Sequence, residues 1–175
     1  MSELAGDLLA RFRWVEGHAD IWRLLYDNNL FCRLAAALAD PFRREEISKV
    51  AGIEARGFIL GAAVALELHA GFVAVRKPGG LFPGEKLVRL TPADYRQTET
   101  ELRLQQQSLS RGDRVVLVDD WFETGSQALT AKALIEEAGA EFVGASVIVD
   151  QLQPDERAQF DRFSALLLYA DLPID

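Results

Sequence analysis

Two adjacent carboxylates, Asp119 and Asp120, are followed a few residues later by Thr124, Gly125 and Ser126. Carboxylates can accept hydrogen bonds from the hydroxyl groups of a sugar. A glycine-containing loop that opens a helix presents backbone N–H groups and the positive end of the helix dipole, which suits a phosphate. A ribose 5-phosphate group needs both features side by side. These residues therefore predict a site for a phosphorylated sugar.

The elements that position these residues can be predicted from the flanking sequence. Residues 115–118 are consecutive apolar residues, mostly valine, and predict a buried strand. After the loop, apolar residues recur at helical spacing from Ala128 up to Gly139, with Ser126 as the expected N-cap. The segment has neither the Gly-Lys-Ser/Thr of a P-loop nor the GxGxxG of a dinucleotide-binding turn. The site is expected where the strand ends and the helix begins.

The segment 115–128, VVLVDDWFETGSQA, resembles the phosphoribosyl-diphosphate (PRPP) binding motif of type I phosphoribosyltransferases. The usual form of that motif is a hydrophobic strand, two acids, two hydrophobic residues, any residue, and then Thr-Gly. The resemblance implies that PRPP is bound by Asp119, Asp120, Glu123, Thr124, Gly125, Ser126 and Gln127. The tail of the loop departs from the usual Gly-Gly-Thr and loses one hydroxyl. A turn whose acids only cap a helix is the alternative.

A second segment, residues 49–85, is similar to adenine phosphoribosyltransferase almost throughout. The pattern predicts a strand, a tight loop, a helix and a second strand at residues 47–53, 54–57, 58–69 and 71–75. The resemblance implies that Arg56, Arg76 and Lys77 surround the diphosphate of PRPP. Three cations would neutralise a leaving group of about three negative charges, and Arg76 is expected to stabilise the charge that develops there. A solvated basic patch is the alternative for Arg76 and Lys77.

The residues expected at the base depart from the adenine family. That family has a FRDIT-like stretch near the N-terminus, where this chain has HADIW at residues 18–22. It also has Glu-Tyr-Gly in a flexible loop, where this chain has Arg96-Gln97-Thr98, a run more similar to bacterial xanthine phosphoribosyltransferase. Glu123 stands where hypoxanthine-guanine enzymes have an acid/base aspartate, so we expect Glu123 to accept the purine proton. Stabilising the helix N-terminus is its alternative role.

Three further residues are expected to contact the base. Trp121 occupies the position of a hydrophobic side chain that flanks the base in the related enzymes, and it can stack on a purine or belong to the core. Asp150 and Gln151 follow a predicted strand, where 6-oxopurine enzymes have a lysine. Asp150 could accept from an exocyclic amine, and Gln151 could donate or accept. The missing lysine favours adenine, and an exposed strand-end acid is the alternative for Asp150.

Strand and helix patterns alternate along the chain, which predicts an α/β fold with a mostly parallel twisted sheet and helices on both faces. Further elements are expected at residues 4–12, 30–38, 142–149 and 165–169. The pattern weakens within 79–112, where 87–90 and 98–104 alternate like a hairpin. The resemblance implies a single domain, 1–175, with an N-terminal hood at about 1–45 and a loop and two-stranded flap at 79–112 that closes over PRPP.

Composition narrows the class of protein. The chain has 175 residues, of which 49% are hydrophobic, enough for one domain with a sizeable core. No apolar run approaches the length of a membrane span, and no signal peptide is predicted. A single cysteine, Cys32, favours the cytoplasm and is expected in the core of an apolar helix. The net charge of −8 argues against nucleic acid as a partner.

The residues and the resemblance together predict a purine phosphoribosyltransferase of purine salvage, with adenine favoured, which converts PRPP and a base into a nucleotide and diphosphate. Magnesium is the implied cofactor, held through PRPP, and direct contact with Asp119 or Asp120 is left open. A homodimer is expected, without nucleic acid or membrane partners. Two alternatives stay open. They are a 6-oxopurine (xanthine or hypoxanthine) phosphoribosyltransferase and a non-catalytic regulatory protein that binds PRPP or a nucleotide.

Overall fold

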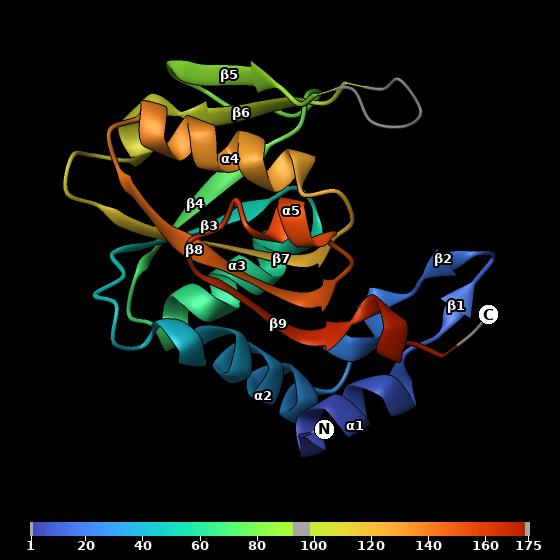
Figure 1. Ribbon diagram of the computed structural model, residues 1–175. Coiled ribbons are helices and arrows are strands. Elements are labelled where there is room, and N and C mark those ends of the chain that lie inside the picture. Colours follow the sequence, from blue (N-terminus) through green and yellow to red (C-terminus); the bar gives the residue numbers. More distant parts are fainter. Residues whose placement is uncertain (1, 93–98, 174–175) are drawn as a thin grey trace.

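A seven-stranded sheet forms the centre of the protein. The computed structural model describes residues 2–92 and 99–173. The strands are β3 (Lys49–Ile53), β4 (Gly71–Arg76), β5 (Lys86–Leu90), β6 (Glu101–Gln105), β7 (Arg114–Phe122), β8 (Glu141–Asp150) and β9 (Phe163–Leu168). They lie in the order β5-β6-β4-β3-β7-β8-β9 (Figure 1). All neighbours from β4 to β9 are parallel, whereas β5 and β6 are antiparallel, so the predicted mostly parallel sheet is confirmed.

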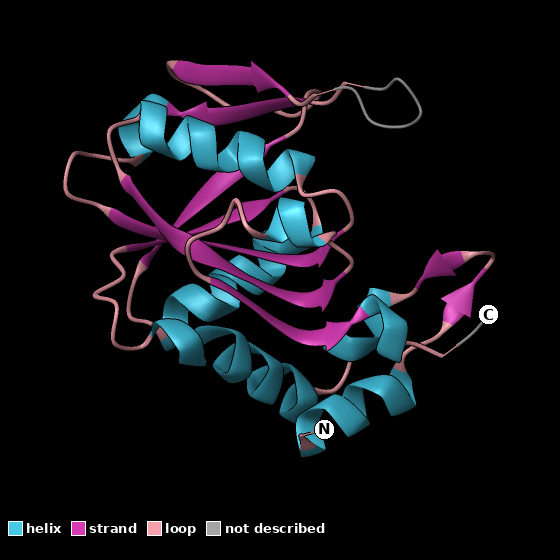
Figure 2. Ribbon diagram, in the orientation of Figure 1, coloured by secondary structure: helices cyan, strands magenta, loops and turns pink. Residues whose placement is uncertain are grey.

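Helices cover both faces of this sheet (Figure 2). The α-helices are α1 (Glu3–Arg11), α2 (Asn28–Ala39), α3 (Arg56–Glu67), α4 (Ser126–Glu137) and the short α5 (Pro154–Arg157). Short 3₁₀ turns are η1 (Ile21–Leu25), η2 (Asp40–Phe42), η3 (Gln106–Ser108) and η4 (Tyr169–Asp171). A separate hairpin consists of β1 (Trp14–Val15) and β2 (His18–Ala19). None of these helices is long and apolar enough to cross a lipid bilayer.

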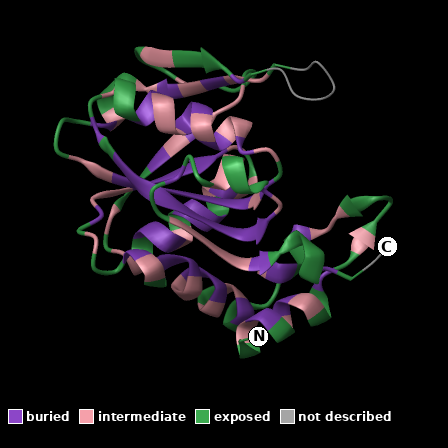
Figure 3. Cartoon of the chain, viewed as in Figure 1, coloured by how far each residue is buried: buried purple, intermediate pink, exposed green. Residues whose placement is uncertain are grey.

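The central strands contribute side chains to two apolar cores, one on each face of the sheet (Figure 3). Val116 and Val118 pack into the core with α1, α2 and α3, while Val115 and Leu117 pack into the core with α4. All four side chains are fully buried. A strand covered on both faces needs apolar residues at successive positions rather than at alternate ones. This requirement explains the continuous apolar run that precedes the two carboxylates.

The direction of winding changes between β3 and β7. β3 leads through α3 to β4 on one side, whereas β7 leads through α4 to β8 on the other side. At such a switch point the loops that follow the two neighbouring strands diverge and leave a crevice at the carboxyl ends. The loops in question, 54–57 and 123–127, contain most of the residues predicted to bind PRPP. The fold therefore brings the two sequence segments together at one edge.

Strand β7 is longer than the predicted strand at 115–118, because its ladder with β8 continues past the apolar run. Asp119 is paired with Val147, and the last residues of β7 are paired in the same way up to Phe122. Asp119 and Asp120 are therefore part of the strand, and both are buried. The expected loop begins only at Glu123.

Two local predictions are wrong. Gly125, with a φ of 70°, is the N-cap of α4, and Ser126 is the first helical residue. Glycine accepts this left-handed conformation without the steric cost that serine would meet. Cys32 is exposed rather than in the core, because Leu30 and Leu34 occupy the inward-facing positions of α2.

The predicted hairpin is present as β5 and β6, but it is attached to the sheet. β6 pairs with β4 at Val75 and Arg76, so the hairpin extends one edge of the sheet. The Arg96-Gln97-Thr98 run lies outside the described residues. In the predicted hood, α1 and the β1–β2 hairpin lie together (Figure 1), and Trp14 in the hairpin donates from Nε1 to the Pro173 carbonyl at 2.8 Å. Whether the β5–β6 hairpin closes over PRPP stays a prediction.

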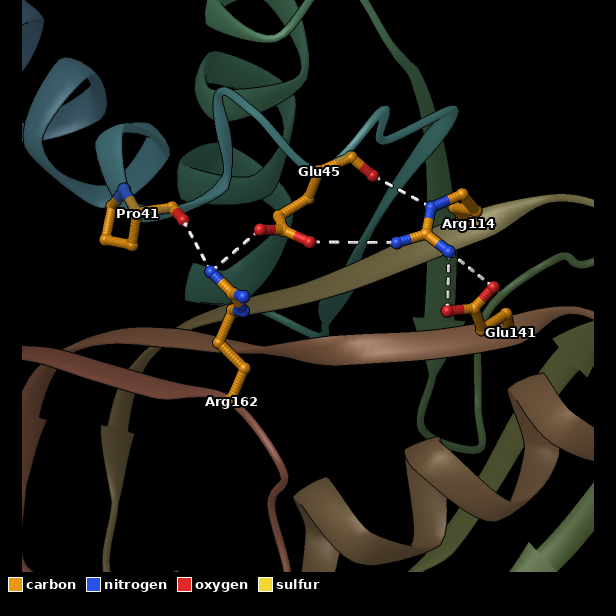
Figure 4. Close-up of polar contacts among 5 residues, drawn as sticks. All are labelled: Pro41, Glu45, Arg114, Glu141 and Arg162. Carbon is orange, nitrogen blue, oxygen red and sulfur yellow. Dashed lines mark hydrogen bonds and ion pairs between the residues drawn. The ribbon is translucent and has the colours of Figure 1, made fainter.

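An ion-pair network joins the amino ends of the strands at the opposite edge of the sheet (Figure 4). Arg114, the first residue of β7, donates from Nε to the carbonyl of Glu45 at 2.8 Å and pairs with Glu141, the first residue of β8. Arg162, just before β9, lies 2.9 Å from the Glu45 carboxylate and contacts the Pro41 carbonyl. Single exposed pairs stabilise little, but together these contacts hold the strand starts in register.

Candidate active site

A cavity of about 700 Å³ lies at the carboxyl ends of β3 and β7, at the switch point of the sheet. Two of its sides come from the loops that follow these strands, and another comes from the β1–β2 hairpin. Most of the predicted site residues line it, namely Arg56, Lys77, Asp119, Asp120, Trp121, Glu123, Thr124, Gly125, Ser126, Gln127 and Gln151. Arg76 and Asp150 are not among the lining residues.

The starts of two helices line the same cavity. α3 begins at Arg56 and α4 at Ser126, and neither N-cap residue, Ala55 or Gly125, supplies a side-chain hydrogen bond to its helix. The first N–H groups of a helix have no acceptor within the helix, and the helix dipole is positive there. Lys77 adds a full positive charge on the same wall. This side of the cavity is therefore suited to bind phosphate groups at two places.

Asp119 and Asp120 are neighbours near the end of β7, and they line the same cavity as the two helix starts. Arg56 Nε is 2.9 Å from Asp120 Oδ2, but it is not aligned for a hydrogen bond, so this buried oxygen lacks a hydrogen-bond donor among the described residues. Asp119 Oδ1 accepts the backbone N–H of Asp120 at 2.9 Å. Burial, and then the adjacent Asp120 charge, raise the pKa of Asp119 well above its usual range. A buried acceptor without a donor suits a ribose hydroxyl.

The close approach of α3 to these carboxylates depends on two glycines. A Cβ placed on Gly57 would lie 3.0 Å from Asp119 Oδ1. A Cβ placed on Gly52, in β3, would lie 2.0 Å from the carbonyl oxygen of Gly57, which is well inside van der Waals contact. The loop after β3 can therefore lie against β7 only because both positions lack a side chain.

Arg76 does not take its predicted place among the cations that face the cavity. Its Nε and Nη2 donate to the Glu54 carboxylate at 3.1 and 2.9 Å, and Nη1 donates to the Leu81 carbonyl at 2.7 Å. Glu54 also accepts the backbone N–H of Lys77. The hydrogen bond from Arg76 is the largest of the effects that lower the pKa of Glu54. Arg76 therefore braces the loop after β3 against the segment after β4.

The remaining wall of the cavity is aromatic. Trp14, Trp22, Trp121 and Tyr169 line it. The Trp121 ring makes edge contacts with Trp14 and Tyr169, at centroid distances of 6.2 and 5.8 Å. Trp121 Nε1 donates to Gln151 Oε1 at 2.8 Å. Flat apolar faces of this kind suit a planar heterocycle.

Sequence reasoning did not assign Trp14 or Tyr169 to the cavity, although both line it. His18 and Trp22 line it as well, and they belong to the segment 18–22 that was compared with the base-binding stretch of the adenine family. One signal was available, because the chain has only three tryptophans and all of them are in this wall. Tyr169 follows β9, so it lies at the carboxyl edge of the sheet, where ligands of α/β proteins bind. Rare aromatic residues at strand ends would have identified this wall.

Asp150 is not among the residues that line the cavity, and its predicted role at the base stays a prediction. Its Oδ1 accepts the backbone N–H of Leu152 at 2.9 Å, and its Oδ2 is paired with Arg157. The residue is 4% exposed, so it is not a solvated strand-end acid either. Both oxygens are already occupied, and Asp150 orients the turn between β8 and α5.

Glu123 is exposed at the cavity wall, between the end of β7 and the loop that opens α4. In that loop, Ser126 Oγ lies 3.1 Å from Thr124 Oγ1, so the two hydroxyls stand together beside the helix start. The loop thus places one carboxylate and two hydroxyls around the N–H groups of α4.

Comparisons with known proteins identify the family of this chain. The phosphoribosyl transferase domain model matches residues 22–166. The adenine phosphoribosyltransferase of Myxococcus xanthus is 37% identical over 95% of this chain and 94% of its own length. The crystal structure of the adenine phosphoribosyltransferase from Rhodothermus marinus has a TM-score of 0.84 at 31% identity, covering 94% of this chain and 98% of that one. The Giardia lamblia enzyme, solved with 9-deazaadenine, has a TM-score of 0.83 at 28% identity, covering 96% and 98%. The chain belongs to the phosphoribosyltransferase family, and within it to the adenine phosphoribosyltransferases.

Proposed function

We propose that this protein transfers the phosphoribosyl group of PRPP to a purine base, adenine in preference, and releases the nucleotide and diphosphate. One observation carries the proposal. A single cavity combines two helix starts whose N-cap residues supply no side-chain hydrogen bond, the Asp119–Asp120 pair and an aromatic wall. Phosphates, ribose and base would each meet a chemically matched surface. Relatives named adenine phosphoribosyltransferase support the choice of adenine.

PRPP would occupy the cavity with its 5-phosphate at the start of α4, where Thr124, Ser126 and the first backbone N–H groups can donate. A ribose hydroxyl would donate to Asp120 Oδ2, the buried oxygen that lacks a donor. The diphosphate would lie at the start of α3, between Arg56 and Lys77. Arg76 supports this place indirectly, because it holds Glu54 and the loop that contains Arg56.

In the reaction, a ring nitrogen of the purine forms a bond to the anomeric carbon while the bond from that carbon to a diphosphate oxygen breaks. The electron pair leaves with the diphosphate, where Arg56, Lys77 and the α3 N-terminus stabilise the negative charge. The attacking base then carries one proton too many. Glu123 accepts that proton, because its carboxylate lines the cavity next to the phosphate loop.

Magnesium is the cofactor that we propose, bound mainly through PRPP. The parts of the chain that the structure describes contain no group of three or more His, Cys, Asp or Glu side chains that could hold a metal. Mg²⁺ keeps several waters and binds through substrate phosphates together with one or two carboxylates. Asp119 and Asp120 are the carboxylates within reach of the ribose side of the cavity. The cation would offset the negative charge of the diphosphate.

We also propose a homodimer that forms through an apolar face on α3 and β4. Ile59 and Leu66 on α3 are 40% and 78% exposed, and Phe72 on β4 is 38% exposed. The rings of Phe58 and Phe72 are 5.8 Å apart, which joins the two elements into one surface.

For localisation we propose the cytoplasm, since a single cysteine cannot form an internal disulfide.

Diphosphate release tests the proposed activity. The protein is incubated with PRPP, Mg²⁺ and adenine, hypoxanthine, guanine or xanthine in turn, and adenine should give the fastest release. In the matched variant Asp120→Asn, loss of the charge-assisted hydrogen bond to ribose should weaken PRPP binding about tenfold or more. Asp161→Asn, on the exposed surface, is the control and should behave as the wild type.

Each alternative predicts a different result in the same assay. Release with hypoxanthine or xanthine but not with adenine would make the protein a 6-oxopurine enzyme. Saturable PRPP binding without release with any base would favour the regulatory protein. Absence of PRPP binding by the wild type would contradict the assignment of the whole site.

A further inference from the structure

We propose that Trp121 and Gln151 form a specificity-determining pair that presents an N–H donor to an acceptor atom on the edge of the base. The inference rests on the proposed function and specifies which kind of atom the base pocket selects. Gln151 alone could donate or accept. The structure removes this ambiguity.

The orientation of the Gln151 amide follows from its partner. Trp121 Nε1 and Gln151 Oε1 are 2.8 Å apart. An indole N–H can only donate, so the amide must present its oxygen to Trp121. The NH₂ group then faces away from the indole, and Gln151 lines the cavity. The hydrogen bonds found within the described part of the chain include none from Gln151 Nε2.

Both partners are held in place without a ligand. The backbone N–H of Gln151 donates to the carbonyl of Phe122 at 2.9 Å, which ties the end of β8 to the end of β7. The Trp121 ring is held between Trp14 and Tyr169. Trp14 is itself fixed, because its Nε1 donates to the Pro173 carbonyl at 2.8 Å. A group that is already oriented loses little conformational entropy when the base binds.

The direction of this donor decides which bases fit. A base with a lone pair at the matching position, such as a ring nitrogen of adenine, pairs with the Gln151 NH₂ group. A base with a C–H at that position leaves the donor unpaired beside the aromatic wall of the cavity. Leaving a polar group unpaired costs more than a hydrogen bond gains, so a single donor can discriminate strongly.

Deaza analogues test the pair, because each replaces one ring nitrogen of adenine with C–H. We compare kcat/KM for adenine with that for 1-, 3- and 7-deazaadenine in the wild type, in Gln151→Leu and in Trp121→Phe. In the wild type, one analogue should be poorer than adenine by about tenfold or more. The loss should lie mainly in KM, since the contact exists before and during the reaction.

In Gln151→Leu, the penalty for that analogue should shrink to about twofold or less, because no donor remains to be left unpaired. Trp121→Phe keeps an aromatic ring and frees the amide to rotate, so it should reduce the same penalty. Gln159→Leu removes an exposed glutamine away from the cavity and should leave the wild-type pattern unchanged. A PRPP-dependent rise in melting temperature confirms that each variant is folded.

An unchanged analogue penalty in Gln151→Leu would overturn the inference, and so would equal use of adenine and all three analogues by the wild type. If Gln151→Leu does not fold, Gln151→Glu replaces it. This variant keeps an acceptor for Trp121 and removes the donor, so it should lose the penalty as well. A wild type that uses no purine at all would contradict the proposed function instead, which separates the two failures.

Discussion

At the scale of single residues, Asp119 makes a contribution to stability that depends on pH. In the unfolded chain it ionises at the ordinary pKa of an aspartate, whereas burial and the neighbouring Asp120 raise its pKa in the folded protein. Between these two values the folded protein binds more protons than the unfolded chain. The contribution of Asp119 is therefore fully present below the unfolded pKa and declines as pH rises toward the folded pKa.

Asp119→Asn should therefore stabilise the protein at high pH. The amide oxygen can still accept the N–H of Asp120, but no charge is buried. The melting temperature should exceed that of the wild type on the order of a few degrees at pH 8, and the difference should vanish near pH 4. PRPP affinity should fall in the same variant. Asp161→Asn is the control, and a gain that does not change with pH would contradict the argument.

Glu123→Gln tests the proton acceptor. The change preserves the size of the side chain and most of its hydrogen bonding, but an amide cannot take the purine proton. Turnover should fall about a hundredfold, while the affinity for PRPP stays close to that of the wild type. Initial rates and PRPP titration measure the two effects separately. Wild-type turnover in this variant would mean that Glu123 only stabilises the start of α4, and that Glu99 or Glu101 should be examined next.

The sequence predicted the phosphate side of the site better than the roles of its charged residues. Loop N–H groups and a helix start depend on local sequence, so Thr124 and its neighbours lie where expected. The roles of Arg76 and Asp150 depend on their ion-pair partners, which a sequence pattern does not predict. The Arg76 guanidinium is paired with Glu54, and the Asp150 carboxylate is paired with Arg157.

At the scale of elements, the packing of α3 against β7 depends on Gly57. Gly57→Ala would place a methyl group 3.0 Å from Asp119 Oδ1, so either the carboxylate or the start of α3 must move. We expect PRPP affinity to fall about tenfold and the melting temperature to fall by a few degrees. Gly6→Ala in α1 is the control, since a Cβ there meets nothing within 4 Å. It should stabilise the protein by up to about 1 kcal/mol. Equal behaviour of the two variants would show that the close approach at Gly57 has no effect.

The elements themselves could be predicted where one strand or helix carries its own signal. The apolar runs located β3, β7 and β8, and helical spacing located α2 and α4. The end of β7 could not be predicted, because Asp119 and Asp120 stay in the strand through their pairing with β8. The attachment of β6 to β4 likewise depends on a neighbour that is distant in the sequence.

At the scale of the whole molecule, the alternation of strands and helices predicted a mostly parallel sheet, but not the order of its strands. The aromatic wall shows why this order matters. Trp14 comes from the hood, Trp121 from β7, Gln151 from the end of β8, and Tyr169 from the turn after β9. These segments meet only when the sheet order and the position of the hood are fixed. A net charge of −8 likewise says nothing about the cationic wall within the cavity.

The homodimer is a property of the whole molecule, and it can be tested at the face formed by α3 and β4. Leu66 is 78% exposed there, and Ile59 on α3 and Phe72 on β4 are exposed as well. A twofold interface uses the same surface on both copies, so Leu66→Glu would introduce two carboxylates into an apolar contact. Light scattering should give a dimer for the wild type and a monomer for this variant, with an unchanged circular dichroism spectrum. Leu90→Glu, at a position 58% exposed on β5, is the matched control and should remain a dimer. A wild type that is monomeric at all concentrations would rule out the dimer, and dissociation by Leu90→Glu alone would move the interface to the β5–β6 edge.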